Sequence, residues 1–394
     1  MKALVIAPQP FFSPRGTPFS VYYRTLISSE LGVKMDLLTY GEGQDVDIDN
    51  VNIIRIPRFK ALGNVKLGPS FLKLFLDLFI IAKMISLLIK NKYDFVHAHE
   101  EAIFFAFFLK PVFKFKLIYD MHSSLPQQLT NFKFTTSKII INIFKYLEDK
   151  CLENADAVIT ICPDLRDYVN GIIKDKDKHF LIENSIFEDV RLKNKIAASN
   201  PGKDNFDGLN GFVENGQKLI VYAGTLEKYQ GIDILVKAMQ KVVRQTKNVK
   251  LLIAGGTQEQ VESFSQLAQK YNVDSNIKFT GRVAQKLAKE FTNKADILVS
   301  PRSDGTNTPL KIYEQLASGK PLVATNIYSH TQVLTDDVAF LVNPNPEDMA
   351  KGILAAIQNE DLAKVKVNNA LELYKNEYSR SVYKNKLKKL LDSL

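Results

Sequence analysis

The chain has 394 residues, of which 45% are hydrophobic and 24% charged, and its formal net charge is +9. These values exclude a disordered or fibrous protein and predict a globular one with two domains rather than one. The two cysteines, Cys151 and Cys162, make neither a CxxC pair nor a disulfide framework, so a reducing, cytoplasmic setting is expected. The opening MKALVIAP has no basic-then-apolar pattern of a signal peptide.

Strand and helix patterns alternate along the first half of the chain. A short apolar run at 2–8 is followed by a helix pattern at 20–31, and a Phe-rich helix is predicted at 71–90. Further strands are predicted at 33–40, 51–57, 93–99, 116–122, 155–162 and 179–184. Because the apolar runs are short and continuous, they favour a parallel sheet that is covered on both faces.

A polar stretch at 193–217 interrupts this alternation, which then restarts. Strands are predicted at 218–224, 249–256, 276–281, 295–301, 321–325 and 338–344, and two helical segments after Pro346. We therefore predict two doubly wound α/β domains, 1–190 and 218–375, with a linker or insertion at 191–217. A last helix at 376–394 is expected to pack back on the N-terminal domain. Ligands of such domains bind at the carboxyl ends of the strands.

The segment from Arg55 to Lys145 is both basic and rich in Phe. It holds 14 Lys and Arg against 5 Asp and Glu, which is a net +9. This composition indicates a membrane surface or an anionic, lipid-linked partner; the alternative is a helix packed on a sheet with lysines reaching into water. Insertion across the membrane is not expected, because Lys73, Asp77 and Lys83 lie within 71–90. Nucleic acid is not an expected partner.

The stretch SPRSDGTNTPLKIYEQLASGKPLVAT, residues 300–325, places a lysine where helix rules ask for an acid. With Thr308 as N-cap and Pro309 as first residue, a helix is predicted at 309–318, and Lys311 is its third residue. A cation there opposes the helix dipole unless an anion binds. Arg302 can reach the same anion, and Glu314, on the same face, suits ribose hydroxyls. The pattern predicts a nucleoside diphosphate site; the alternative is a solvated surface helix.

The whole chain resembles the retaining, GT-B glycosyltransferases of family 4. The resemblance rests on SPRGTPFSVYYRTLISSEL, FVHAHE, LIYDMHS, VYAGTLEKYQGIDILVKAM, LLIAGG, IKFTGRV and EQLASGKPLVAT. It implies two Rossmann-like domains facing each other across a deep cleft, and transfer of a sugar from a nucleotide-sugar to an acceptor hydroxyl with retention of configuration. The product would belong to cell-surface polysaccharide or glycolipid synthesis, and the acceptor would be a sugar or a lipid-linked molecule.

The resemblance also implies roles for individual residues. His122 matches the position that contacts the donor sugar, and it is expected to be catalytic together with Arg302 and Lys311. Arg15 and His99 are expected on the acceptor side. Donor-binding positions are expected at Gly16 and Thr17, in a tight turn after the first strand, and at Thr225, Gly281, Arg282, Val283, Asn307, Thr308, Pro309, Leu310 and Glu314.

Three positions depart from the family pattern. Thr306 replaces the first glutamate of the family's pair, and Thr225 and Gln230 stand where the family has Arg and Lys to neutralise the diphosphate. Arg302 and Lys311 are the expected substitutes, with Lys228 as a further candidate. The departures keep a second function open, a non-catalytic nucleotide- or glycan-binding homologue that supports another transferase. A sugar-nucleotide epimerase is a third alternative.

No metal or other cofactor is expected. His97 and His99 form an H-x-H without a visible third ligand, and DVDID at 45–49 reads as a solvated loop. A cytoplasmic protein, associated with the inner face of the membrane through its basic, Phe-rich segment, is the expected setting.

Overall fold

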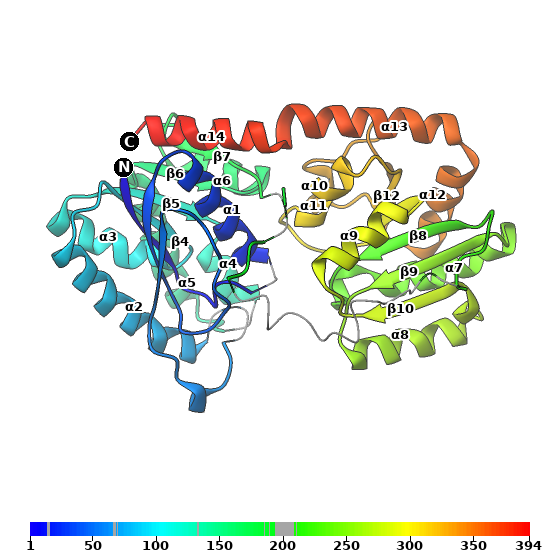
Figure 1. Ribbon diagram of the computed structural model, residues 1–394, viewed down its shortest axis with the longest axis horizontal. Coiled ribbons are helices and arrows are strands. Elements are labelled where there is room, and N and C mark those ends of the chain that lie inside the picture. The colour runs from blue at the N-terminus through cyan, green and yellow to red at the C-terminus, as the bar shows by residue number, and fades with distance from the viewer. Residues whose placement is uncertain are drawn as a thin grey trace. The chain divides into compact units, whose positions relative to one another are not determined.

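The computed structural model describes residues 1–13, 16–65, 68, 70–131, 134–184, 186–188, 190–193, 209 and 211–394. The chain divides into two compact units, Met1–Asn194 with Arg380–Leu394, and Lys195–Ser379 (Figure 1). We call them unit 1 and unit 2 and describe each by itself. Arg15 and most of the linker expected at 191–217 lie outside the described residues.

Unit 1 is built on a parallel sheet, which in the described residues has seven strands in the order β3-β2-β1-β4-β5-β6-β7. The strands are β1 (Lys2–Ala7), β2 (Lys34–Thr39), β3 (Val51–Arg55), β4 (Phe95–His99), β5 (Lys116–Met121), β6 (Ala157–Thr160) and β7 (His179–Leu181). The helices are α1 (Gly16–Glu30), α2 (Phe71–Lys90), α3 (Ala102–Phe113), α4 (Leu125–Asn131), α5 (Lys138–Asn154), α6 (Pro163–Ile172) and α14 (Arg380–Asp392), with a 3-10 turn, η1 (Lys60–Leu62).

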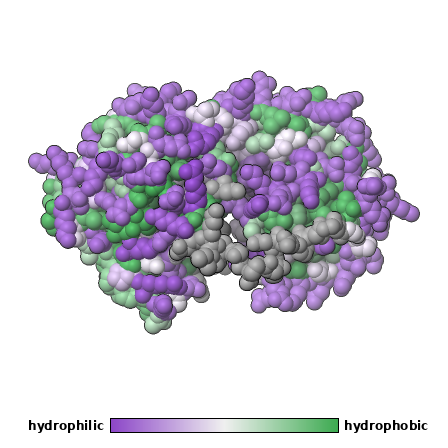
Figure 2. All heavy atoms as spheres, in the orientation of Figure 1, coloured by the Kyte–Doolittle hydropathy of each residue, from purple (hydrophilic) through white to green (hydrophobic). Residues whose placement is uncertain are grey.

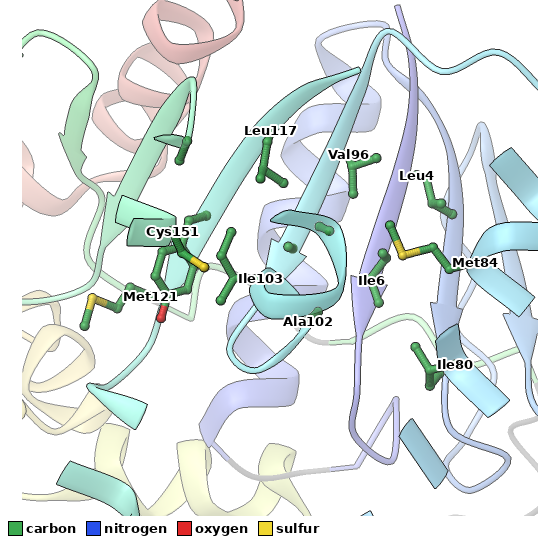
Figure 3. Packing of buried hydrophobic residues seen from close by; sticks show 14 of the residues in the cluster. Leu4, Ile6, Ile80, Met84, Val96, Ala102, Ile103, Leu117, Met121 and Cys151 are labelled. Atoms are coloured by element: carbon green, nitrogen blue, oxygen red, sulfur yellow. The ribbon is translucent and has the colours of Figure 1, made fainter. Parts of the chain in front are cut away.

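Helices α2, α3 and α5 cover one face of this sheet. Ile80 and Met84 of α2, Ile103 of α3 and Cys151 of α5 join β1, β4 and β5 in one buried cluster (Figure 3). Helix α2 occupies the predicted 71–90, and the side chain of Ser70 caps it by accepting from the backbone N–H of Lys73. Within the described part of the chain, no helix has the length and hydropathy needed to cross a membrane.

Unit 2 repeats the plan with a parallel sheet of six strands in its described part, in the order β10-β9-β8-β11-β12-β13. The strands are β8 (Lys218–Ala223), β9 (Val249–Ala254), β10 (Ile277–Gly281), β11 (Ile297–Ser300), β12 (Leu322–Thr325) and β13 (Phe340–Val342). The helices are α7 (Ile232–Gln245), α8 (Gln258–Lys270), α9 (Gln285–Lys294), α10 (Leu310–Ala317), α11 (Tyr328–Thr331), α12 (Pro346–Gln358) and α13 (Glu360–Leu373), with 3-10 turns η3 (Lys228–Gln230) and η4 (Asp274–Asn276) and a π-helical turn η5 (Tyr374–Tyr378).

The order of strands reverses between β1 and β4 in unit 1 and between β8 and β11 in unit 2. At such a point the connections leave in opposite directions, so the loops at the carboxyl ends part and leave room for a ligand. The predicted α/β class with two doubly wound sheets is confirmed.

Three local predictions were wrong. Gly16 and Thr17 lie in the first turn of α1 rather than in a tight turn, since Pro18 is tolerated so early in a helix. Helix α10 begins at Leu310, because Pro309 keeps an extended ψ of 135° and is the N-cap in place of Thr308. Three helices follow Asn345 instead of two, because the backbone leaves the helical conformation at Asn359 and Ser379.

Helix α14 belongs to unit 1, although it follows unit 2 in the chain. Arg380 and Lys384 both pair with Glu30 of α1, and Lys386 Nζ donates to Glu183 Oε2 at 2.7 Å. Its apolar side, Tyr383, Leu387, Leu390 and Leu391, is buried. Burial of each such side chain contributes about 1.5–3 kcal/mol, so packing outweighs the exposed ion pairs in holding α14.

Candidate functional site

The carboxyl ends of β8 and β11 in unit 2 come very close together. Gly231, the N-cap of α7, has a φ of 68°, and a Cβ there would lie 1.9 Å from the carbonyl oxygen of Pro301, just after β11. Glycine alone permits this approach. It brings Gln230 beside the loop that leads into α10.

Lys311 lies at this junction of β8 and β11. Its Nζ donates to Gln230 Oε1 at 3.2 Å and sits 4.1 Å from the centre of the Tyr222 ring. Among the described residues it takes part in no ion pair with a carboxylate. Burial and the neighbouring charge of Arg302 lower the pKa of Lys311 to about 7. The ammonium is therefore held in place but is poorly neutralised by its surroundings, as expected of a cation that binds an anionic ligand.

Arg302 stands at the end of β11 and lies over the Tyr229 ring, with its Cζ 5.1 Å from the ring centre. Its Nε donates to the carbonyl oxygen of Asp304 at 2.6 Å, so the side chain folds onto its own loop. Gly305 makes this possible, since its φ is 127° and a Cβ would lie 2.1 Å from the Arg302 guanidinium. Burial lowers the pKa of Arg302, yet guanidinium stays charged.

The other predicted residues of this segment are the start of α10, the residues before it, and Glu314. Leu310 and Lys311 are the first two helical residues, and Asn307 and Thr308 precede the N-cap Pro309. The Thr308 Oγ1 is buried without a hydrogen-bond partner among the described residues. Burial raises the pKa of Glu314 to about 7, against the opposing charge of Lys289.

Further predicted donor-binding residues contact the site less directly or not at all. Thr225 is exposed, and its Oγ1 accepts from Gln230 Nε2 at 3.5 Å. Gly281 ends β10 with a φ of 65°, Arg282 is exposed, and Val283 packs against a buried cluster of unit 2. Lys228 and Thr306 are both exposed.

Sequence reasoning missed the group that holds the Arg302 loop. His330 is fully buried; its Nδ1 donates to the carbonyl oxygen of Thr325 at 2.9 Å, and its Nε2 lies 3.0 Å from Ser300 Oγ. Burial lowers its pKa to about 4, so the ring is neutral and Nε2 accepts from the Ser300 hydroxyl. Thr325 Oγ1 also donates to the Arg302 carbonyl. The contacts of His330 with Ser300 and of Thr325 with Arg302 join residues 30 and 23 positions apart, and no spacing in the sequence predicts them.

Unit 2 also has a cavity of about 530 Å³ at the opposite edge of its sheet, next to the amino ends of β8 and β11. Ion pairs of Lys218 with Asp296 and Glu360 cross its rim. None of the predicted site residues lines it.

In unit 1 the predicted His122 belongs to a buried polar network. Asp120 of β5 and Arg24 of α1 are both fully buried, with Arg24 Nε 2.8 Å from Asp120 Oδ2 and its Nη2 3.3 Å from Oδ1. Burial alone would raise the pKa of Asp120, but the charge of Arg24 outweighs it and holds that pKa well below its usual range. Asp120 is therefore an ionised carboxylate inside the unit.

Three histidines gather on this carboxylate. His97 Nε2 donates to Asp120 Oδ2 at 3.0 Å, and His99 Nδ1 lies 3.1 Å from His122 Nε2. The rings of His97 and His99 stack with their centres 4.5 Å apart. Burial lowers the pKa of His122 to about 4 and that of His99 well below its usual value. Both rings are neutral and can orient a hydroxyl, but they do not act as cations.

The structure corrects the argument that His97 and His99 lack a third metal ligand. Asp120 supplies one, because the three ligating atoms lie within 4.8 Å of one another. Both oxygens of Asp120 already accept from the Arg24 guanidinium, however, and a divalent cation would meet that positive charge. In the structure, Asp120 joins Arg24 and the histidines in a hydrogen-bond network. In the loop at 45–49, Asp45 pairs with Arg55.

The start of α1 lies beside a carboxylate that sequence reasoning overlooked. Thr17 Oγ1 donates to Glu100 Oε1 at 3.5 Å, while a Cβ on Gly16 would meet nothing within 4 Å. Glu100 follows β4 with a φ of 50°, a left-handed conformation that is uncommon outside glycine. Burial, and then the charge of Glu101, raises the pKa of Glu100 to about 7. No pattern in the sequence predicts a left-handed conformation at Glu100.

Known protein families match both halves of the chain. The model "Glycosyltransferase Family 4" matches residues 27–187, and "Glycosyl transferases group 1" matches residues 210–373. An uncharacterized glycosyltransferase of Methanocaldococcus jannaschii is 24% identical over 373 residues, with 88% of this chain and 85% of the relative covered. A phosphatidyl-myo-inositol mannosyltransferase of Mycobacterium tuberculosis is 27% identical over 161 residues, with 39% and 41% covered.

Solved structures show the same fold. Sucrose-phosphate synthase from Thermosynechococcus elongatus superposes with a TM-score of 0.74 at 18% identity, covering 99% of this chain and 98% of its own. HepE from Anabaena, solved in complex with UDP, superposes with a TM-score of 0.73 at 14% identity over the full length of both chains. With two parallel α/β sheets and matches in both halves, the chain belongs to the GT-B glycosyltransferases of the family 4 type.

Proposed function

We propose that the protein transfers a hexose from a nucleoside diphosphate-sugar to an acceptor hydroxyl with retention of configuration, for a cell-surface polysaccharide or glycolipid. The observation that carries this proposal is the Lys311 ammonium, held by Gln230 and Tyr222 with no carboxylate partner in the described part of the chain. Two relatives point the same way: HepE has been solved with UDP and with UDP-glucose, and the mannosyltransferase acts on phosphatidyl-myo-inositol, as its name states.

The chemistry asks the protein to stabilise negative charge on the leaving diphosphate. Lys311 and Arg302 supply two positive charges, and the backbone N–H groups of Leu310 and Lys311, in the first turn of α10, have no partner within the helix. These groups perform the task without a metal ion. Glu314 would accept from ribose hydroxyls, and the neutral His122 would hydrogen-bond the donor sugar. Gln230 and Thr225 would contact the donor by hydrogen bonds where the family has cations.

The deciding experiment is calorimetric titration with UDP, GDP, ADP and their sugar derivatives, followed by incubation of the bound donor with an acceptor panel. Transfer to an acceptor, with the anomeric configuration of the product read by NMR, would establish the reaction and its retention. Tight binding without transfer or hydrolysis would favour the non-catalytic homologue, for which Thr225, Gln230 and Thr306 argue. No binding at all would contradict both.

Donor binding is expected to weaken as the pH rises above about 7. Only the ammonium form of Lys311 attracts the diphosphate, and its pKa in the free protein is about 7. The bound anion raises that pKa, so binding takes up a proton; affinity is full below pH 7 and falls above it. UDP-glucose is a suitable probe because its phosphodiester groups do not titrate in this range.

The measurement is calorimetry between pH 6 and 9 in buffers of different ionisation enthalpy, which also counts the protons taken up. Lys311→Arg is the matched control, because a guanidinium stays charged throughout and should flatten the profile. Glu314, whose pKa is also about 7, becomes ionised over the same interval and is tested separately as Glu314→Gln. An unchanged slope in Lys311→Arg would contradict the assignment.

We also propose that unit 1 binds the inner surface of an anionic membrane through α2, α3 and α5. These helices cover one face of the sheet, so their outward sides form one layer. Figure 2 shows hydrophobic residues among hydrophilic ones at the left of that view, over α2 and α3. Large apolar side chains are exposed there, Phe71 by 80% and Val112 by 70%, together with Leu74, Leu78, Phe108, Ile139 and Ile143. Exposed lysines lie on the same helices or just beyond them: Lys83, Lys90, Lys114, Lys138 and Lys145.

Flotation with anionic vesicles at low salt tests this surface. Wild type is expected to float, and Phe71→Ser with Leu78→Ser should float much less, because exposed aromatic and aliphatic side chains anchor a protein at the interface. The matched control is Leu362→Ser with Val365→Ser, which removes two exposed apolar groups, 45% and 54% exposed, from α13 of unit 2. Equal flotation of both double variants would show that this surface does not bind lipid.

A further inference from the structure

Arg24, in the middle of α1, is only 1% exposed, and no other arginine among the described residues is buried to this degree. A fully buried ion pair such as Arg24–Asp120 is rarely a net gain in stability over an apolar pair, because both ions lose their hydration. Stability therefore does not explain why this ion pair is present. Asp120 contacts three histidines directly, which indicates that the pair serves the geometry of the site.

We propose that Arg24 and Tyr383 are positioning residues that fix the orientation of His122 through Asp120, so that helix α14 supports the active site of unit 1. This inference rests on the proposed contact of His122 with the donor sugar. It goes further by assigning a role to residues from α1 and α14, which no sequence motif singled out.

The outer part of this arrangement is an aromatic cover over Arg24. The Tyr383 ring of α14 lies over the guanidinium, with the Arg24 Cζ 5.4 Å from the ring centre. Tyr383 in turn packs edge-on against Phe187, with ring centres 5.1 Å apart. A cation over an aromatic face in a dry environment is stabilised by the ring quadrupole. The ring therefore keeps water from Arg24 and restricts its side chain.

The inner part runs from the guanidinium to the imidazoles. Arg24 contacts both oxygens of Asp120, and a further bond from its Nη2 to the Ile182 carbonyl at 3.4 Å ties it to the end of β7. The carboxylate plane is thereby set. His122 Nε2 lies 3.5 Å from Asp120 Oδ1, and His99 Nδ1 lies 3.5 Å from Oδ2 and 3.1 Å from His122 Nε2. Rotation of Asp120 would break these contacts together.

The charge of Arg24 adds to the effect of burial in lowering the pKa of the His122 and His99 imidazoles. Without Arg24, the buried carboxylate would draw protons onto the neighbouring rings, because an unpaired charge in a dry site is costly. With Arg24 in place, burial and the positive charge of Arg24 together keep His122 and His99 neutral. A neutral ring offers one donor and one acceptor nitrogen in fixed positions, which is what the orientation of a sugar hydroxyl requires.

The test compares variants that disturb the contacts of Arg24 with variants of α14 that leave the aromatic cover over Arg24 in place. Tyr383→Leu removes the ring, Tyr383→Phe retains it, and Lys384→Gln removes an ion pair between α14 and Glu30 at the surface. Arg24→Lys keeps the charge but cannot bond both carboxylate oxygens in a planar fork. For each variant, turnover and donor dissociation constant are measured, and the ring signals of the five histidines are recorded by NMR after selective labelling.

Tyr383→Leu and Arg24→Lys are expected to lower turnover about tenfold to a hundredfold, the size of effect that misplacement of a catalytic group produces. The donor dissociation constant should rise only modestly, because the groups proposed to hold the diphosphate lie in unit 2 and His122 contacts only the sugar. The His122 ring signal should shift in the same two variants. Tyr383→Phe and Lys384→Gln should resemble wild type in all three measurements.

Equal loss of turnover in Tyr383→Leu and Lys384→Gln, with an unmoved His122 signal, would show that α14 is only a structural brace and would overturn the inference. If wild type transfers no sugar, the proposed function fails, but the histidine signals still decide the positioning role. In that case, a His122 signal that shifts in Tyr383→Leu and Arg24→Lys, but not in Tyr383→Phe or Lys384→Gln, would still support the positioning role.

Discussion

Lys311→Ala is expected to weaken the binding of the cognate nucleoside diphosphate by about 1.5–3 kcal/mol, the size of a hydrogen bond to a charged group. The ammonium is held at the junction of β8 and β11 by the Tyr222 ring and the Gln230 amide, and no carboxylate competes for it among the described ion pairs. Its removal takes away charge that the diphosphate would meet on arrival. Calorimetry of wild type and variant with the same nucleotide measures the difference.

The geometry allows a sharper form of this experiment. Lys311 Nζ and Gln230 Oε1 are 3.2 Å apart, so an ammonium carried by residue 230 would occupy nearly the same place. The double variant Gln230→Lys with Lys311→Gln should regain most of the affinity that Lys311→Gln alone loses. Lys228→Ala is the control, since Lys228 is exposed on the neighbouring turn. Unchanged affinity in Lys311→Ala, or a larger loss in Lys228→Ala, would refute the assignment.

Asp120→Ala is expected to lower the free energy of unfolding by about 3–5 kcal/mol, because it leaves the Arg24 guanidinium buried without its partner. Urea denaturation followed by circular dichroism measures the loss. The matched control is Asp167→Ala, which breaks the exposed pair with Arg166 and should cost at most about 1 kcal/mol. A cost for Asp120→Ala as small as that of the control would mean that water reaches Arg24 in solution.

Local patterns in the sequence predicted the parts of the fold that depend on neighbouring residues. Helix α2 has the predicted bounds, since Ser70 caps it and its apolar side chains recur at helical spacing. The strand ends were found because each strand is a short apolar run. The helix at Leu310 was misplaced by one residue, because a proline can serve either as N-cap or as first helical residue.

The contacts that define the candidate site could not be predicted in the same way. Lys311 drew notice because it breaks a local rule, but its partner Gln230 is 81 residues away in the chain. Arg24 and Asp120 are 96 residues apart, and no local pattern in the sequence pairs them. The histidines at 97, 99 and 122 were singled out as strand ends, while the ion pair that holds them was not, because pairing across a sheet leaves no periodic signal.

The return of α14 to unit 1 imposes an order on how the chain can fold during synthesis. Unit 2 is one uninterrupted segment, Lys195–Ser379, and can close as soon as it has left the ribosome. Unit 1 emerges first, but its last helix, Arg380–Asp392, is made after all of unit 2. Until then Glu30, Glu183 and the guanidinium of Arg24 lack the side chains of α14 that complete their surroundings. The N-terminal half of the nascent chain therefore stays incompletely folded until α14 has been made, and chaperones can bind it in this state.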